Sequence, residues 1–244
     1  GGQEALLREL VRNRDFLVRQ RVAEANRADE VKHCPFSRKM ADRRLAQTDR
    51  DIKKTELEMR KVVNAIIDPF HHSMLALAAM PAPVIASLHG AVAGAGVSVA
   101  LAADLAIAAD DMKMNLAYAR IGTSPDGSAS FSLPRVVGLR KALEIALLCE
   151  QIDAAEALRL GLVNTVVPAA DLAAQTDALA RRLADGPTLA YGRIKHLMRA
   201  SFGHSLSEQL NAERDAFVAS AGTHDFAEGV AAFVQKRPAR FEGR

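Results

Sequence analysis

A short apolar strand, a glycine turn and a helix of small residues constrain the fold of this chain most strongly. Residues 84–88 are apolar except for one serine, which predicts a buried strand. Gly94 and Gly96 follow, and residues 97–109 are small and apolar with one charge, Asp104. This order predicts a strand, a tight turn, a buried helix and a second strand, with glycines that let the backbone approach another group closely.

The glycine turn has two possible roles. If a helix begins there, its first N–H groups have no acceptor within the helix and suit a developing oxyanion. The same glycines are also consistent with close packing of the helix on the strand, because a single Gly-x-Gly is a weak motif.

Composition is that of a globular domain: 244 residues, 49% hydrophobic and 25% charged. Residues 1–61 hold 16 Lys and Arg against 11 Asp and Glu. The signs are mixed, which favours a solvated helical surface over nucleic-acid binding. No apolar run predicts a membrane span, and the chain starts without a signal-peptide pattern. Two cysteines, Cys34 and Cys149, indicate neither a disulfide framework nor a metal site, so we expect a cytoplasmic protein.

The first 80 residues predict helices. A first helix carries the apolar residues between Leu6 and Leu17, and residues 26–37 form a break with Pro35 as the stop. A second helix covers Arg38–Ile67, and Asp68-Pro69 interrupts it before a third helix that ends at Met80.

Strands and helices alternate after residue 80. We expect Leu143, Ala146 and Leu147 to face inward, Asp171 to cap a helix and Gly161 to end one. The expected strands are 83–88, 105–108 and 163–167, and the expected later helices are Arg140–Cys149, Ala154–Leu160, 171–184, Thr188–Ser201, Ser207–Ala219 and Phe226–Gln235.

Five blocks follow one another in a familiar order: PVIASLHGAVAGAGVSVALAADLAIA, IGTSPDG, LPRVVGLRKALEIALL, AAEALRLGLVNTVVP and AEGVAAFVQKRPARF. Over residues 65–241 the chain resembles the crotonase (enoyl-CoA hydratase/isomerase) superfamily, and its pattern is most similar to the enoyl-CoA isomerases. The resemblance implies an α/β fold, a crotonase-like ββα spiral core with C-terminal helices, preceded by an atypical, mostly helical N-terminal segment. The expected parts are a charged helical segment at 1–64, the core at 65–200 and a helical trimerisation region at 201–244.

The N-terminal segment departs from that family. Crotonases open with strands and helices that supply the first oxyanion N–H, near a Phe-x-Ala-Gly-x-Asp signature. Residues 3–61 contain no such signature. The first oxyanion donor therefore has no assignable residue.

The resemblance implies chemistry on a thioester, with two backbone N–H groups stabilising an enolate. The second donor corresponds to Ala95, between Gly94 and Gly96. Hydratases of the family activate water with two glutamates, and those positions hold Ser98 and Tyr118 here. Neither is a carboxylate, so hydration by the usual route is not expected, and both residues are expected to contact substrate.

Asp126 is the acid left at the expected place, in Ser124-Pro125-Asp126-Gly127. Isomerases of the family carry an acid in a similar Pro-acid-Gly turn, and one carboxylate suffices to move a proton between two carbons. Pro-Asp-Gly is also a common turn sequence, so a purely structural role stays open.

Other polar residues have weaker claims. Lys236 and Arg237 resemble the family's tail near the CoA phosphates, or form a solvated charge cluster. His89 could face the pocket but is more typical of a packed or turn histidine, and His71-His72 lacks partners at ligand spacing. Asp104, in an apolar helix, should be paired.

Three functions therefore stay open. The first is an acyl-CoA-processing enzyme, an enoyl-CoA isomerase using Asp126 and the Ala95 N–H. It needs no cofactor beyond the CoA of its substrate and assembles as a homotrimer or a dimer of trimers. The second is a catalytically inactive CoA-ester-binding or scaffold protein with the same fold. The third is nucleic-acid binding through residues 1–61.

Overall fold

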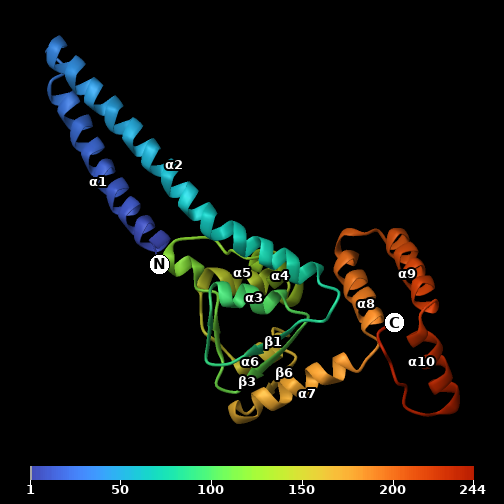
Figure 1. Ribbon diagram of the computed structural model, residues 1–244. Coiled ribbons are helices and arrows are strands. Elements are labelled where there is room, and N and C mark those ends of the chain that lie inside the picture. Colours follow the sequence, from blue (N-terminus) through green and yellow to red (C-terminus); the bar gives the residue numbers. More distant parts are fainter. Residues whose placement is uncertain (1) are drawn as a thin grey trace. The chain divides into compact units, whose positions relative to one another are not determined.

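The computed structural model describes residues 2–244 and divides into two compact units at His72 and Ser73 (Figure 1). The first unit holds α1 (Gly2–Glu30) and most of α2 (Pro35–Ala79). The second holds the end of α2 and all the strands of the described chain. The predicted three-part division at 64 and 200 stays a prediction.

The first unit is a helical hairpin with a mostly polar seam. Arg21 pairs with Asp49 at 2.6 Å between Nε and Oδ1, and Asn13 donates to Thr55 Oγ1 at 3.4 Å. No residue of α1 is buried. The expected helical character of this segment is confirmed. No helix in residues 2–244 is long and apolar enough to cross a membrane.

Two predicted helix ends in this unit are wrong. Pro35 is the first residue of α2, where a proline costs nothing because the first N–H of a helix has no acceptor. Pro69 lies inside α2 and does not end it. A proline removes one helical hydrogen bond, and here the helix continues on both sides of it, with the ring nitrogen of His72 3.0 Å from the carbonyl oxygen of Asp68.

A three-stranded parallel sheet forms the centre of the second unit. Its order is β1 (Ile85–Leu88), β3 (Leu105–Ala109) and β6 (Thr165–Val167), which confirms the three predicted strands. Ile85 lies opposite Leu105, and Ile107 lies opposite Thr165.

The middle strand is buried on both faces, as parallel strands usually are. Ala106 and Ala108 face the main core, whose most buried members include Met112. Ile107 and Ala109 alternate with them and pack against Leu172 at the start of α7 (Leu172–Ala184). Since side chains alternate along a strand, one strand contributes to two apolar layers.

A second small sheet and several helices complete this core. Strand β2 (Ala91–Ala93) pairs in parallel with β4 (Lys113–Asn115), which pairs antiparallel with β5 (Ile152–Asp153). The helices between the strands are α3 (Ala95–Ala102), η1 (Tyr118–Ile121), α4 (Ala129–Val137), α5 (Leu139–Leu148) and α6 (Ala154–Arg159).

The chain ends in a group of helices after α7 (Figure 1). Gly161 follows α6 with a positive φ of 75°, as expected of a helix stop. The other elements are η2 (Ala169–Asp171), α8 (Thr188–Ala200), η3 (Ser201–Gly203), α9 (Leu206–Ala221) and α10 (His224–Gln235).

Three details differ from expectation. In α5 the buried residues are Ala142 and Ile145, whereas Leu143 and Leu147 are exposed, because this helix is apolar around most of its circumference. Asp171 stands at the start of α7 without a capping hydrogen bond from its side chain. Helix α4 was not expected, because Pro134 lies inside it.

An ion-pair cluster joins α8 to the central sheet. Asp104 lies 2.7 Å from both Lys195 Nζ and Arg199 Nη2, and it accepts the backbone N–H of Val84 at 2.8 Å. The prediction that Asp104 is paired is confirmed, and the cluster ties α8 to the start of β1.

Candidate active site

The glycine turn opens α3 and leaves its first N–H groups accessible. Gly94 has φ 52° and ψ −119°, a conformation that side chains rarely adopt, and its N–H donates to the carbonyl of Asn115 at 3.0 Å. Ala95 is the first residue of the helix and is exposed. Its N–H lies in the first turn, where a helix provides no acceptor, so it can donate to an incoming oxygen.

Gly96 is not required by the packing of the chain. A Cβ at this position would meet only Val92 Cγ1, at 3.9 Å, which is ordinary van der Waals contact. The glycine therefore leaves the outer side of the first helical turn bare, beside the N–H of Ala95.

Ser98 lies one turn further along α3, and it contacts the predicted acid. Its side chain is 0% exposed. Its hydroxyl donates to the carbonyl oxygen of Asp126 at 2.6 Å and lies 3.2 Å from the hydroxyl of Tyr118. The Tyr118 hydroxyl lies 3.4 Å from the same carbonyl. Ser98, Tyr118 and Asp126 are thus brought together at α3, the helix that begins with Ala95.

The turn that carries Asp126 has an unusual backbone. Gly127 and Ser128 have φ of 59° and 72°, and Ser128, as a residue with a Cβ, is strained there. The Asp126 carboxylate accepts the N–H of Gly127 at 2.7 Å through Oδ1. Asp126 itself is half-buried, and hydrogen bonds hold both its backbone carbonyl and its carboxylate.

Helix α3 links the glycine turn to the turn that carries Asp126. Ala95 and Ser98 are three residues apart, so they share a helix face and are separated by about 4.5 Å along the axis. Because the Ser98 hydroxyl bonds to the backbone carbonyl of Asp126, that turn is joined to α3.

Residues that the sequence did not single out support Tyr118. The carbonyl of Cys149 accepts hydrogen bonds from Asn115 Nδ2 at 2.7 Å and from Arg120 Nη2 at 2.5 Å. Cys149 has a positive φ of 51°. These bonds hold η1, the element that begins with Tyr118. No local sequence signal marks them, because the partners are 29 and 34 residues apart.

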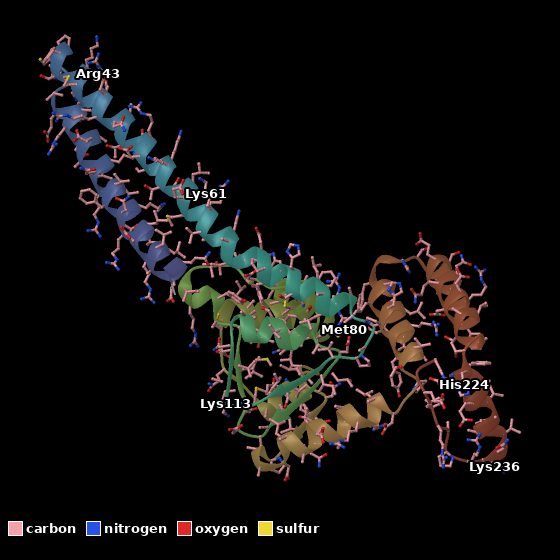
Figure 2. All side chains as sticks on the ribbon, in the orientation of Figure 1. Arg43, Lys61, Met80, Lys113, His224 and Lys236 are labelled. Carbon is pink, nitrogen blue, oxygen red and sulfur yellow. The ribbon has the colours of Figure 1, made fainter. Side chains whose placement is uncertain are left out.

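The two cationic side chains of the predicted CoA-binding tail differ: one forms an ion pair and the other is exposed. Lys236 follows α10 with φ 53° and is exposed, and Figure 2 labels it at the end of that helix. Arg237 forms two hydrogen bonds with Glu228, at 2.6 and 2.8 Å. That guanidinium and the backbone N–H of Arg240 lower the pKa of Glu228 to about 2. Of the two predicted cations, Arg237 is thus ion-paired with Glu228, whereas Lys236 is exposed.

The histidines considered from the sequence lie outside this cluster. His89 follows β1 and is exposed, and His71 and His72 lie on α2. Across residues 2–244 no group of three or more His, Cys, Asp and Glu side chains is arranged to hold a metal ion.

Comparison with known proteins gives the relationships of the chain. Residues 49–244 match the family model for enoyl-CoA hydratase/isomerase, so the match begins earlier than residue 65. A probable enoyl-CoA hydratase from Rhodobacter capsulatus is 41% identical over 169 residues, 69% of this chain and 66% of that protein. The 1,2-epoxyphenylacetyl-CoA isomerase of Escherichia coli is 39% identical over 168 residues, 69% of this chain and 64% of that protein.

The structural comparison agrees. The crystal structure of an enoyl-CoA hydratase from Polaromonas is similar with a TM-score of 0.73 and 35% identity, covering 79% of this chain and 75% of that one. The chain thus spans about two thirds of the length of the relatives that it matches by sequence. Its crotonase-type α/β fold is that of the solved relatives. The chain belongs to the enoyl-CoA hydratase/isomerase family.

Proposed function

We propose that the protein is an acyl-CoA-processing enzyme that isomerises the double bond of an enoyl-CoA. The observation that carries the proposal is the position of Asp126. Its backbone carbonyl accepts the Ser98 hydroxyl from α3, the helix whose first residue is the exposed Ala95. The two positions that would need glutamates for hydration hold Ser98 and Tyr118 instead.

The chemistry follows from these groups. The Asp126 carboxylate removes a proton from the carbon next to the thioester carbonyl of a 3-enoyl chain. The electron pair moves onto the carbonyl oxygen, and the N–H of Ala95 stabilises the resulting enolate. Asp126 then returns the proton to the far carbon of the conjugated system, which leaves a 2-enoyl thioester. One residue acts as base and then as acid, so no second carboxylate is required.

Substrate binding in this proposal uses the glycine turn and the C-terminal tail. Gly94 and Gly96 allow the thioester to approach the helix end, and Lys236 contacts a phosphate of CoA. CoA enters as part of the substrate, and no further cofactor takes part. We place the reaction in the cytoplasm, where free thiols such as Cys34 and Cys149 persist.

A homotrimer or a dimer of trimers is part of the proposal, because large apolar side chains are uncovered in the single chain. Ile121 is 79% exposed and Phe233 is 85% exposed. Large exposed apolar patches usually mark surfaces that contact another chain. Light scattering should give a mass of three or six chains, and a monomer at micromolar concentration would contradict this part of the proposal.

The test of the catalytic role is the substitution Asp126→Asn. Isomerisation of a 3-enoyl-CoA, followed by absorbance of the conjugated product, should fall by about 10²–10⁴-fold. Binding of the CoA ester, measured by calorimetry, should be retained because the carboxylate does not hold the CoA. Asp171→Asn is the matched control, since that exposed side chain makes no capping bond. Full activity of Asp126→Asn would leave Asp126 as a turn residue only.

A second candidate is a CoA-ester-binding protein of the same family without catalysis. One observation favours it: residues 2–72 form a helical hairpin, where the family resemblance calls for the first oxyanion loop. The same assays separate the two functions. A parent protein that binds CoA esters but turns over no enoyl-CoA would establish the second one.

A further inference from the structure

The hydroxyls of Ser98 and Tyr118 bond to the backbone of the residue that carries the proposed catalytic carboxylate. We propose that these two residues are positioning residues for Asp126, and not groups that touch substrate or activate water. This inference rests on the proposed isomerase function. It assigns a role to the two positions where a hydratase of the family would have its glutamates.

Burial is the first argument. Ser98 is 0% exposed, so a ligand cannot reach its side chain without moving the protein. Its hydroxyl has both of its contacts inside the chain, the carbonyl oxygen of Asp126 and the hydroxyl of Tyr118. A water molecule held by Ser98 for attack on a substrate would have to replace one of these two hydrogen-bond partners. The geometry therefore assigns Ser98 to the support of the turn.

The direction of the hydrogen bonds is the second argument. The Ser98 hydroxyl has one proton, and its short 2.6 Å contact uses that proton on the Asp126 carbonyl. The Tyr118 hydroxyl, at 3.2 Å, then donates to Ser98 Oγ, or at 3.4 Å directly to the carbonyl. A chain of two hydroxyls ending on one carbonyl is mutually polarising, which strengthens each bond.

Backbone strain is the third argument. The two residues after Asp126 have left-handed φ values, and Ser128 is not a glycine. Such a conformation persists only where surrounding contacts hold it. The hydroxyl pair supplies part of those contacts at the Asp126 carbonyl, which also accepts the backbone N–H of Ala129 at 3.3 Å. Without the hydroxyl pair the turn can relax, and the Asp126 carboxylate shifts with it.

The experiment measures kcat and KM for isomerisation of a 3-enoyl-CoA by the full chain. Ser98→Ala should lower kcat about tenfold and change KM by less than about twofold, because it removes one hydrogen bond to a partly buried carbonyl. Tyr118→Phe should lower kcat less, because the shorter Ser98 bond remains. The double variant should lose more than the product of the two single losses, since each hydroxyl can partly replace the other.

A background without the carboxylate separates positioning from direct participation. If Ser98 acts through Asp126, then Asp126→Asn with Ser98→Ala should be no slower than Asp126→Asn alone. Ser87→Ala is the matched control, because its hydroxyl makes a 3.0 Å hydrogen bond to Thr176 and stays outside this cluster. That control should keep the parent kcat and KM.

Each contrary result has a distinct meaning. A rise in KM at unchanged kcat for Ser98→Ala, or a further tenfold loss in the Asp126→Asn background, overturns the positioning role. If Ser98→Ala does not fold, Tyr118→Phe replaces it, and its kcat and KM are compared in the parent and in the Asp126→Asn background in the same way. Asp126→Asn at full activity overturns the proposed function instead, and a parent without turnover overturns both.

Discussion

The two long helices of the hairpin and the short helix α3 of the core differ in where their stability comes from. Helix α1 has 29 residues and none of them is buried, whereas α3 has eight residues and four of them are buried. The two helices that form the hairpin meet through hydrogen bonds and ion pairs such as Arg21–Asp49. Helix α3 is held by apolar burial and by the hydroxyl of Ser98.

The length of a helix therefore does not indicate how strongly its contacts stabilise it. Exposed ion pairs contribute about 0–1 kcal/mol each, whereas complete burial of one large apolar side chain contributes about 1.5–3 kcal/mol. The candidate site lies in the region of apolar burial, around α3. The hairpin holds none of the site residues.

The largest expected effect is on the half-buried ion-pair cluster of Asp104 beside the core. Asp104→Asn leaves Lys195, which is 8% exposed, without its counter-charge. We expect a loss of about 3–5 kcal/mol in the free energy of unfolding, measured by urea denaturation. A loss below about 1 kcal/mol would show that this cluster is no stronger than the exposed pairs of the hairpin, and the contrast between the two regions would fail.

A cavity in the core should be nearly as costly. Met112 is 0% exposed, and Met112→Ala removes its thioether chain from the main apolar cluster. We expect a loss of about 2–5 kcal/mol. Val22→Ala on α1 is the control in the other region, because Val22 is exposed, and its loss should stay within about 0.5 kcal/mol. Equal losses for the two variants would contradict the comparison.

A third kind of contact sharpens the comparison, because it is an exposed pair with well-defined geometry. The two hydrogen bonds from Arg237 and the one from Arg240 hold the pKa of Glu228 at about 2, below its ordinary value of 4.5. A lowered folded pKa gives stability that is present above about pH 4.5 and is lost as the pH falls toward 2.

The measurement is the melting temperature between pH 6 and pH 2 for the parent and for Glu228→Gln. The parent should be more stable above about pH 4.5, and the two curves should converge as the pH approaches 2. If the melting temperatures of the two proteins fell in parallel over this range, the pKa of Glu228 would not be lowered in the folded state.

The sequence predicted the core better than the hairpin. The strand, the glycine turn and the helix at 83–109 could be predicted because burial on both faces leaves an uninterrupted apolar run, and glycines mark the turn. The continuity of α2 through Pro69 could not, because a single missing hydrogen bond does not decide the end of a helix that continues on both sides. In α5 the prediction was right for Ala146, which packs against the core, and wrong for Leu143 and Leu147, because apolar residues surround that helix.

The site was predicted as a set of residues but not as a structure. Family resemblance pointed to Ala95, Ser98, Tyr118 and Asp126. The bond from Ser98 to the carbonyl of Asp126 joins residues 28 positions apart. Only the folded chain brings them together, and their positions in the sequence carry no periodic signal. The resemblance therefore placed Ser98 and Tyr118 on the substrate, whereas the structure gives their hydroxyls partners in the protein.

The smallest expected effect tests the polar seam of the hairpin. Arg21 and Asp49 lie 2.6 Å apart, and their side chains are 48% and 41% exposed, so water screens their attraction. A double-mutant cycle of Arg21→Ala and Asp49→Asn should give a coupling of about 0–1 kcal/mol, and 1 M salt should reduce it further. Asp49→Asn is the same chemical change as Asp104→Asn, so the two variants compare one substitution in two environments. A coupling above about 2 kcal/mol, unaffected by salt, would show that the seam is shielded from water and that the hairpin is more than a pair of solvated helices.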